Sequence, residues 1–268
     1  MTIRTLLSRL LSATPLALLP VRVRKGPARG ARWTLLPFSF NWREGGEGDL
    51  VPGLALVQPL RGAVCWDFGA HFGIHAIGMA MQVGPTGQVA AFEPDPVAFT
   101  RLERHIRINR LVNIRAYSAA VSEATGSVQL ISSCGLGSTF SHMRYPDEPE
   151  PDPREVIAVN SVAPDELVRK GEILLPHLIK VDVQGHGANA IAGSIRSIRA
   201  SSPVILFSGH GTSETMGVRD LIEPLGYRLL NLRSEEISWE ELGAEPGILI
   251  PEEVQKTLAP DPRSDQRE

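Results

Sequence analysis

A carboxylate and two glycines stand close together in the segment Asp67 to Gly73, which reads DFGAHFG. Gly69 permits a backbone turn that a Cβ atom would obstruct, and Gly73 lets a following helix begin close to a ligand. The free N–H groups at the start of that helix can face a negative group. Asp67 adds a carboxylate directly before the turn. The segment therefore predicts a binding turn for a small charged molecule.

A second carboxylate, Glu93, follows Gly69 by 24 residues and ends the next apolar run. At the tip of a neighbouring strand, it could accept hydrogen bonds from both hydroxyls of a ribose. The alternative is that Glu93 caps the helix that begins at Pro96.

The spacing of the turn indicates which ribose-containing cofactor it holds. Dinucleotide sites use a GxGxxG turn, whereas Gly69 and Gly73 give GxxxG. Asp67 would repel a pyrophosphate but attract the cationic methionine part of S-adenosylmethionine (SAM). We therefore expect SAM as the cofactor. An NAD-dependent oxidoreductase is the less favoured alternative.

Two Gly-His-Gly triplets, at 185–187 and 209–211, carry residues that could move a proton. The flanking glycines leave each imidazole free to approach a ligand, and histidine titrates near neutral pH. Because methyl transfer needs an aligned, partly deprotonated nucleophile, we expect Asp182 near the transfer centre and His186 or His210 as the general base. The alternative is that the glycines only make turns around solvated histidines. The three side chains could also bind a divalent metal, but we expect no metal.

Apolar runs alternate with amphipathic runs, which predicts an α/β fold. The seven principal strands are expected at 63–68, 88–92, 113–119, 177–183, 203–207, 227–232 and 248–250, with an extra strand at 127–131, and the expected helices cover 72–81, 96–109, 188–200 and 214–225. This order is typical of a seven-stranded, mostly parallel sheet with helices on both faces. Such a sheet gathers the candidate residues at the carboxyl ends of its strands.

The chain is expected to form one domain with extensions. We expect residues 1–60 to be an irregular, basic N-terminal extension packed on the domain, 61–255 to be the SAM-binding domain, and 256–268 to be a disordered tail. The insertion at 132–156 is polar and rich in proline and acid, which predicts a mobile surface loop. A loop of this length is often a lid or a substrate loop.

Composition and charge narrow the class of protein. The chain has 268 residues, of which 43% are hydrophobic and 21% charged, with a net charge of −3, so we expect no nucleic-acid partner. No acidic residue precedes Glu44, and this basic segment suits peripheral contact with an anionic membrane, or else a solvated arm. Its longest uncharged run, 10–21, is shorter than the roughly 20 residues that span a bilayer. Two cysteines exclude a disulfide framework, and we expect a cytoplasmic protein with a buried thiol at Cys65.

Four segments resemble the FkbM family of methyltransferases. They read VCWDFGAHFG (64–73), GQVAAFEPDPVAFTRLERHI (87–106), VNIRAYSAAVSEATGSV (112–128) and LIKVDVQGHGANAIAGS (178–194). The resemblance implies a class I SAM-methyltransferase fold, which is Rossmann-like, and methyl transfer to a hydroxyl of a sugar, lipid or secondary metabolite. It also implies cofactor contacts from Ala70, His71, Pro94, Ser118 and Ala119, the last two beside the adenine. We expect a small-molecule or glycan-like acceptor; the sequence predicts no oligomeric state.

The chain departs from the family pattern in the half expected to bind the acceptor. Gln184 and Gly187 replace the glutamates of the motif K-x-D-x-E-G-x-E, Ser208 replaces a strand-end Glu, Ala163 replaces an Asp, and His71 replaces a common Asn. Either the acceptor differs from that of other members, or the chain binds SAM as a non-catalytic or scaffold protein.

Overall fold

A computed structural model of the chain describes residues 20–34, 50–131, 142–143, 152, 155–242 and 246–252. The expected tail at 256–268, most of the 132–156 insertion and much of the N-terminal extension lie outside these residues.

The central sheet has seven strands in the order β12-β13-β11-β10-β3-β4-β5. Its strands are β3 (Val64–Phe68), β4 (Gln88–Phe92), β5 (Ile114–Tyr117), β10 (Leu178–Val181), β11 (Val204–Phe207), β12 (Tyr227–Leu230) and β13 (Gly247–Pro251). Only β13 pairs antiparallel, with β11 on one side and β12 on the other. This arrangement confirms the predicted seven-stranded, mostly parallel sheet.

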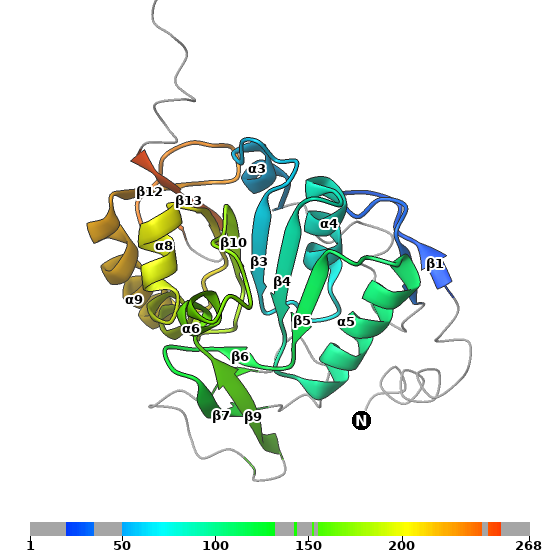
Figure 1. Cartoon of the computed structure of the whole chain (residues 1–268). Coiled ribbons are helices and arrows are strands. Elements are labelled where there is room, and N and C mark those ends of the chain that lie inside the picture. The colour runs from blue at the N-terminus through cyan, green and yellow to red at the C-terminus, as the bar shows by residue number, and fades with distance from the viewer. Residues whose placement is uncertain are drawn as a thin grey trace, which may run out of the picture.

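Helices cover both faces of this sheet, because its buried strands present apolar side chains in both directions. The helices are α3 (Leu50–Ala55), α4 (Ile74–Val83), α5 (Pro96–Asn109), α6 (Pro164–Arg169), α7 (Gly187–Ala192), α8 (Ile195–Ser201) and α9 (Thr212–Ile222), with a 3-10 turn, η3 (Glu223–Leu225), after α9. Cys65 packs toward α3, α4 and α5, whereas Trp66 packs toward α6 to α9. Figure 1 shows α4 and α5 on one side of the sheet and α8 and α9 on the other.

A second, four-stranded sheet has the order β6-β9-β7-β8. It contains β6 (Ala120–Val121), β7 (Gly126–Ile131), β8 (His142–Met143) and β9 (Val156–Val162). β6 begins three residues after β5 ends, so this small sheet stands beyond the carboxyl edge of the central sheet (Figure 1). The extra strand expected at 127–131 is β7 of this sheet. Sequence reasoning missed β9, whose only apolar run, at 156–159, is short and directly follows the polar, proline-rich insertion.

The expectation that residues 1–60 are irregular is wrong for its described part. β1 (Pro20–Arg22) and β2 (Arg32–Thr34) form an antiparallel hairpin. Trp33 is fully buried in a cluster with Ile74 and Ile77 of α4, and its ring stacks on His105 of α5 at 3.7 Å. The hairpin is packed on the domain because burial of these rings and aliphatic groups stabilises it.

The helix predicted at 188–200 is two helices, α7 and α8. Gly193 lies at the break, where an added Cβ would come within 2.0 Å of the Ser122 carbonyl oxygen. The chain after α7 therefore runs against the loop at Ser122 and turns before α8 begins. No helix in the described part of the chain is long and apolar enough to cross a membrane.

Candidate functional site

The glycine turn after β3 has the left-handed backbone that its composition predicts. Gly69 has φ +76° and Gly73 has φ +90°, and both are positions that favour glycine. A Cβ on Gly69 would lie 1.9 Å from the backbone oxygen of Asp182. The turn therefore touches the segment that follows β10, and the two halves of the predicted site are in contact. A Cβ on Gly73 would strike Leu102, so this glycine lets the start of α4 lie close against α5, and its contact with a ligand stays a prediction.

Glu93 connects the glycine turn to the loop after β4. Its Oε2 accepts a 2.7 Å hydrogen bond from the backbone N–H of His71, and its Oε1 accepts a 2.8 Å bond from that of Asp95. Asp95, not Glu93, caps α5, because its side chain accepts from Val97 and Ala98. Burial raises the pKa of Glu93 to about 7, although the two backbone N–H groups act in the opposite direction.

Asp67 lies at the end of β3, opposite Lys180 in the register of β3 and β10. The Lys180 Nζ is 3.3 Å from its Oδ1, and both side chains are buried. Neither carboxylate oxygen of Asp67 accepts a hydrogen bond. The cation that balances Asp67 is therefore Lys180, which sequence reasoning missed, and contact of Asp67 with the methionine part of SAM stays a prediction.

The residues around the turn fit the adenosyl part of SAM. Each Glu93 oxygen has accepted one N–H and keeps a lone pair that a ribose hydroxyl could use. The Glu93 N–H bonds the Tyr117 carbonyl oxygen, which brings Ser118 and the buried Ala119 beside Glu93. Pro94 is half-buried in the loop that follows. Ala70 is buried and donates its N–H to Phe92.

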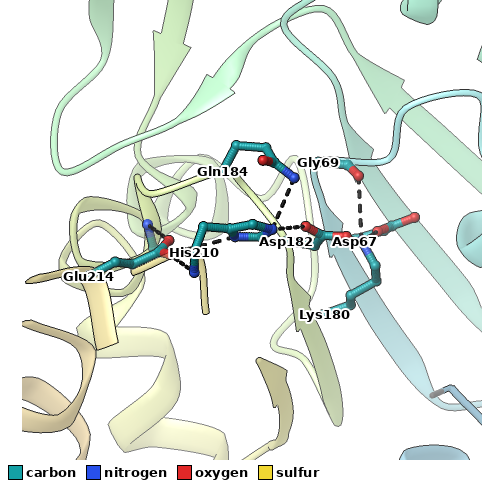
Figure 2. A network of polar contacts seen from close by, with 8 residues as sticks. Asp67, Gly69, Lys180, Asp182, Gln184, His210 and Glu214 are labelled. Carbon is teal, nitrogen blue, oxygen red and sulfur yellow. Dashed lines mark hydrogen bonds and ion pairs between the residues drawn. The ribbon is translucent and has the colours of Figure 1, made fainter. Parts of the chain in front are cut away.

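Asp182 and His210 meet at the carboxyl ends of β10 and β11 (Figure 2). Asp182 Oδ1 is 3.3 Å from His210 Nε2, and the Asp182 and His210 side chains are 32% and 26% exposed, respectively. The Gln184 Nε2 is 2.9 Å from the same ring nitrogen. Lys180 extends this network, since its Nζ lies 3.6 Å from Asp182 Oδ2 and 3.4 Å from the Gly69 carbonyl oxygen.

A buried carboxylate, Glu214, stands behind His210 on the first turn of α9. Its Oε2 accepts the His210 backbone N–H at 2.7 Å and lies 3.6 Å from the ring Nδ1. Burial lowers the pKa of His210, but the interaction with the Glu214 carboxylate and the charge of Asp182 outweigh it, so the net pKa is raised above 6.5. Glu214 has no sequence motif that could have revealed it.

His186 stands in a similar Gly-His-Gly triplet, but its side chain contacts Ser122 instead of Asp182. Its Nε2 is 3.1 Å from the Ser122 Oγ. Burial lowers its pKa, against the charges of Glu214 and Glu123. No hydrogen bond or ion pair joins His186 to Asp182, so of the two described triplet histidines it is His210 that pairs with Asp182.

Two glycines of the triplets allow close packing against α9 rather than free movement of the histidines. A Cβ on Gly187 would lie 2.6 Å from Glu214 Oε1, and one on Gly209 would lie 2.7 Å from Thr215 Oγ1. Gly185 and Gly211 have positive φ. The predicted reason for these glycines is therefore corrected at 187 and 209: each makes room for a side chain of α9.

Among the described residues, no group of three or more His, Cys, Asp or Glu residues could hold a metal ion.

A pocket of about 240 Å³ is lined by Pro85 to Val89 and Val112 to Arg115. It lies at the amino ends of β4 and β5, the edge opposite the acidic and histidine side chains, so it is not the predicted site.

Comparison with known families follows this geometry. The family described as "Methyltransferase FkbM domain" matches residues 67–229, which contain the glycine turn, Glu93 and the pair Asp182–His210. The chain belongs to the FkbM methyltransferase family. Its central sheet is the class I methyltransferase fold that the sequence predicts. Family membership supports a methyltransferase over the nicotinamide oxidoreductase alternative.

Relatives of this FkbM chain include a sugar-modifying enzyme. Hexuronic acid methyltransferase AglP of Haloferax volcanii is 27% identical over 188 residues, covering 66% of this chain and 69% of AglP. Among solved structures, methyltransferase FkbM from Methylobacillus flagellatus is 16% identical, with a TM-score of 0.48, covering 70% of this chain but only 43% of that one. Fibrillarin from Aeropyrum pernix, solved with bound SAM, is 13% identical, with a TM-score of 0.41 and coverage of 75% and 72%.

Proposed function

We propose that this chain is an O-methyltransferase that moves the methyl group of SAM to a hydroxyl of a sugar acceptor. A hexuronic acid is the first acceptor class to test, because AglP carries that substrate in its name. The observation that carries the proposal is the 3.3 Å contact between Asp182 and His210 beside the glycine turn, whose Gly69 touches the Asp182 backbone.

The residues divide into a cofactor half and an acceptor half. Glu93 would hold the ribose hydroxyls, and the turn at 69–73 would carry the rest of the cofactor. When bound, SAM supplies an electrophilic methyl group. His210 is partly exposed, so an acceptor hydroxyl can approach its Nε2.

His210 Nε2 would then take the proton of the acceptor hydroxyl as the oxygen bonds to the methyl carbon and the carbon–sulfur bond breaks, with S-adenosylhomocysteine as the leaving group. Asp182 would stabilise the resulting imidazolium through its contact with Nε2. Lys180 binds Asp67 and the Gly69 carbonyl, so it keeps the turn aligned with Asp182. Alignment of this kind is the larger part of what an in-line displacement requires.

The proposal is tested with purified protein, SAM and paired oligosaccharides that end in glucuronic acid or in glucose. We expect release of S-adenosylhomocysteine and a mass gain of one methylene unit on the uronic acid only. His210→Ala and Asp182→Asn should lower turnover at least about 100-fold while SAM affinity, measured by calorimetry, stays the same.

His186→Ala separates the two histidines. If His210 is the base, this variant should keep most of the turnover. If His186→Ala loses turnover while His210→Ala keeps it, the assignment is contradicted. SAM binding without release of S-adenosylhomocysteine across a broad acceptor panel would support the non-catalytic alternative instead.

A further inference from the structure

Glu214 contacts the backbone of His210 and lies near its imidazole ring. It is 5% exposed and is the third residue of α9, after Gly211 at the N-cap position. Its carboxylate joins two loops, because Oε1 accepts the Gly187 N–H and Oε2 accepts the His210 N–H, each at 2.7 Å. An acid at this position of a helix commonly bonds the N-cap N–H. Here it reaches past the cap to the loops after β10 and β11.

The carboxylate of Glu214 occupies the room that a side chain at position 187 would need. A Cβ at Gly187 would lie 2.6 Å from Oε1 and 3.2 Å from Cδ of Glu214. Position 187 must therefore be glycine for Glu214 to stand where it does. The family pattern has a glutamate at position 187, which is glycine in this chain. The carboxylate of Glu214, on α9, lies beside that position instead.

The groups around His210 act on different ring nitrogens. Glu214 lies on the Nδ1 side at 3.6 Å, whereas Asp182 and Gln184 lie on the Nε2 side at 3.3 and 2.9 Å. Figure 2 shows the ring between these two sets of side chains. Lys180 is the nearby cation and lowers the pKa of His210. The Gln184 amide nitrogen can only donate, so its 2.9 Å contact requires an unprotonated Nε2. The Glu214 carboxylate at Nδ1 favours the same tautomer, with the proton on Nδ1, whereas the Asp182 carboxylate opposes it.

We propose that Glu214 is a positioning residue, which holds His210 with its proton on Nδ1 and its Nε2 toward the acceptor hydroxyl. The catalytic consequence rests on the proposed function. The control of the His210 tautomer does not, so the two can be tested separately.

The test is an NMR titration of the His210 imidazole in the full chain, with the signal assigned by His210→Gln. In wild type we expect a pKa above 6.5 and ring nitrogen shifts of the Nδ1–H tautomer. Glu214→Gln should lower that pKa by about 1 unit and populate the Nε2–H tautomer. Glu123→Gln is the matched control, because Glu123 acts on His186 rather than on His210, and it should leave the His210 titration unchanged.

Gly187→Ala gives an independent arm in which Glu214 itself is intact. The new methyl group should displace the carboxylate and shift the His210 titration in the direction of Glu214→Gln. In a Glu214→Ala background the same change should add no shift, since the group it displaces is gone. An unchanged titration in both Glu214→Gln and Gly187→Ala overturns the proposal.

Turnover on the active sugar acceptor completes the test. Glu214→Gln should lower kcat at neutral pH at least about tenfold, as expected when a base is left in the wrong tautomer, with little change in KM. Its kcat–pH profile should move to lower pH together with the His210 pKa. A shifted titration with wild type inactive on every acceptor would reject the proposed function and retain the positioning role. Full kcat in Glu214→Gln despite a shifted titration would overturn the catalytic consequence.

Discussion

Lys180 Nζ lies 3.3 Å from Oδ1 of Asp67, and the exposures of the two side chains are 2% and 0%. Opposite charges buried this close together compensate each other, and loss of either partner leaves a buried charge. The pair also stands between the glycine turn and Asp182, so its loss should disturb both halves of the site.

Asp67→Asn should therefore lower the free energy of unfolding by about 3 kcal/mol, because the Lys180 ammonium loses its buried counter-charge and keeps only the partly exposed Asp182 carboxylate. Urea denaturation followed by far-UV circular dichroism measures this change. The double variant Asp67→Leu/Lys180→Met should be markedly more stable than Asp67→Asn. Equal stability of Asp67→Asn and wild type would mean that the pair contributes nothing to the fold.

SAM affinity should increase with pH in the neutral range. Burial raises the pKa of Glu93 to about 7, and it is the ionised carboxylate that accepts hydrogen bonds from ribose hydroxyls. Affinity should thus be low below pH 6 and level off above pH 8. Calorimetric titration at several pH values tests this, and Glu93→Gln should bind about 10- to 100-fold more weakly at pH 8 with the pH dependence removed. A flat profile in wild type would contradict the role of Glu93.

Gly69→Ala should be far more damaging than Gly171→Ala. The two glycines have similar φ angles, +76° and +72°, but an added Cβ meets the Asp182 oxygen at 1.9 Å in the first case and nothing within 4 Å in the second. Gly171→Ala should cost about 1 kcal/mol from the backbone angle alone, and Gly69→Ala at least about 2 kcal/mol more. Thermal unfolding measures both, and equal costs would exclude the close contact.

His105 should make the domain sensitive to mild acid. Burial lowers its pKa to about 4, partly offset by its hydrogen bond to the Phe72 carbonyl oxygen, whereas its ordinary value is 6.5. Between these values the unfolded chain binds more protons, so the contribution of His105 is complete above pH 6.5 and is lost as the pH falls toward 4.

Urea titrations from pH 7 to pH 4.5 check this expectation. The free energy of unfolding of wild type should fall more steeply than that of His105→Gln, by up to about 1.4 kcal/mol per pH unit. Tryptophan fluorescence follows the same transition, because Trp33 stacks on His105. Parallel curves for the two proteins would contradict the buried neutral histidine.

The sequence alone determined the central sheet and the glycine turn after its first strand. Apolar runs such as 64–68 and the glycines at 69 and 73 are local signals, since a buried strand and a left-handed turn each restrict the residues that form them. The order of strands and helices then placed Asp67, Glu93, Asp182 and His210 at one edge of the sheet. The helix at 96–109 was predicted with its observed bounds, because its periodicity and its proline are also local.

Only the tertiary structure decided which side chains meet at that edge. Lys180 reaches Asp67 through the register of two strands 113 residues apart, and Glu214 reaches Gly187 from another helix. His186 and His210 have the same neighbours in sequence, yet one contacts Ser122 and the other Asp182. Distances between side chains depend on how whole elements pack, so patterns along the chain contain no direct signal for them.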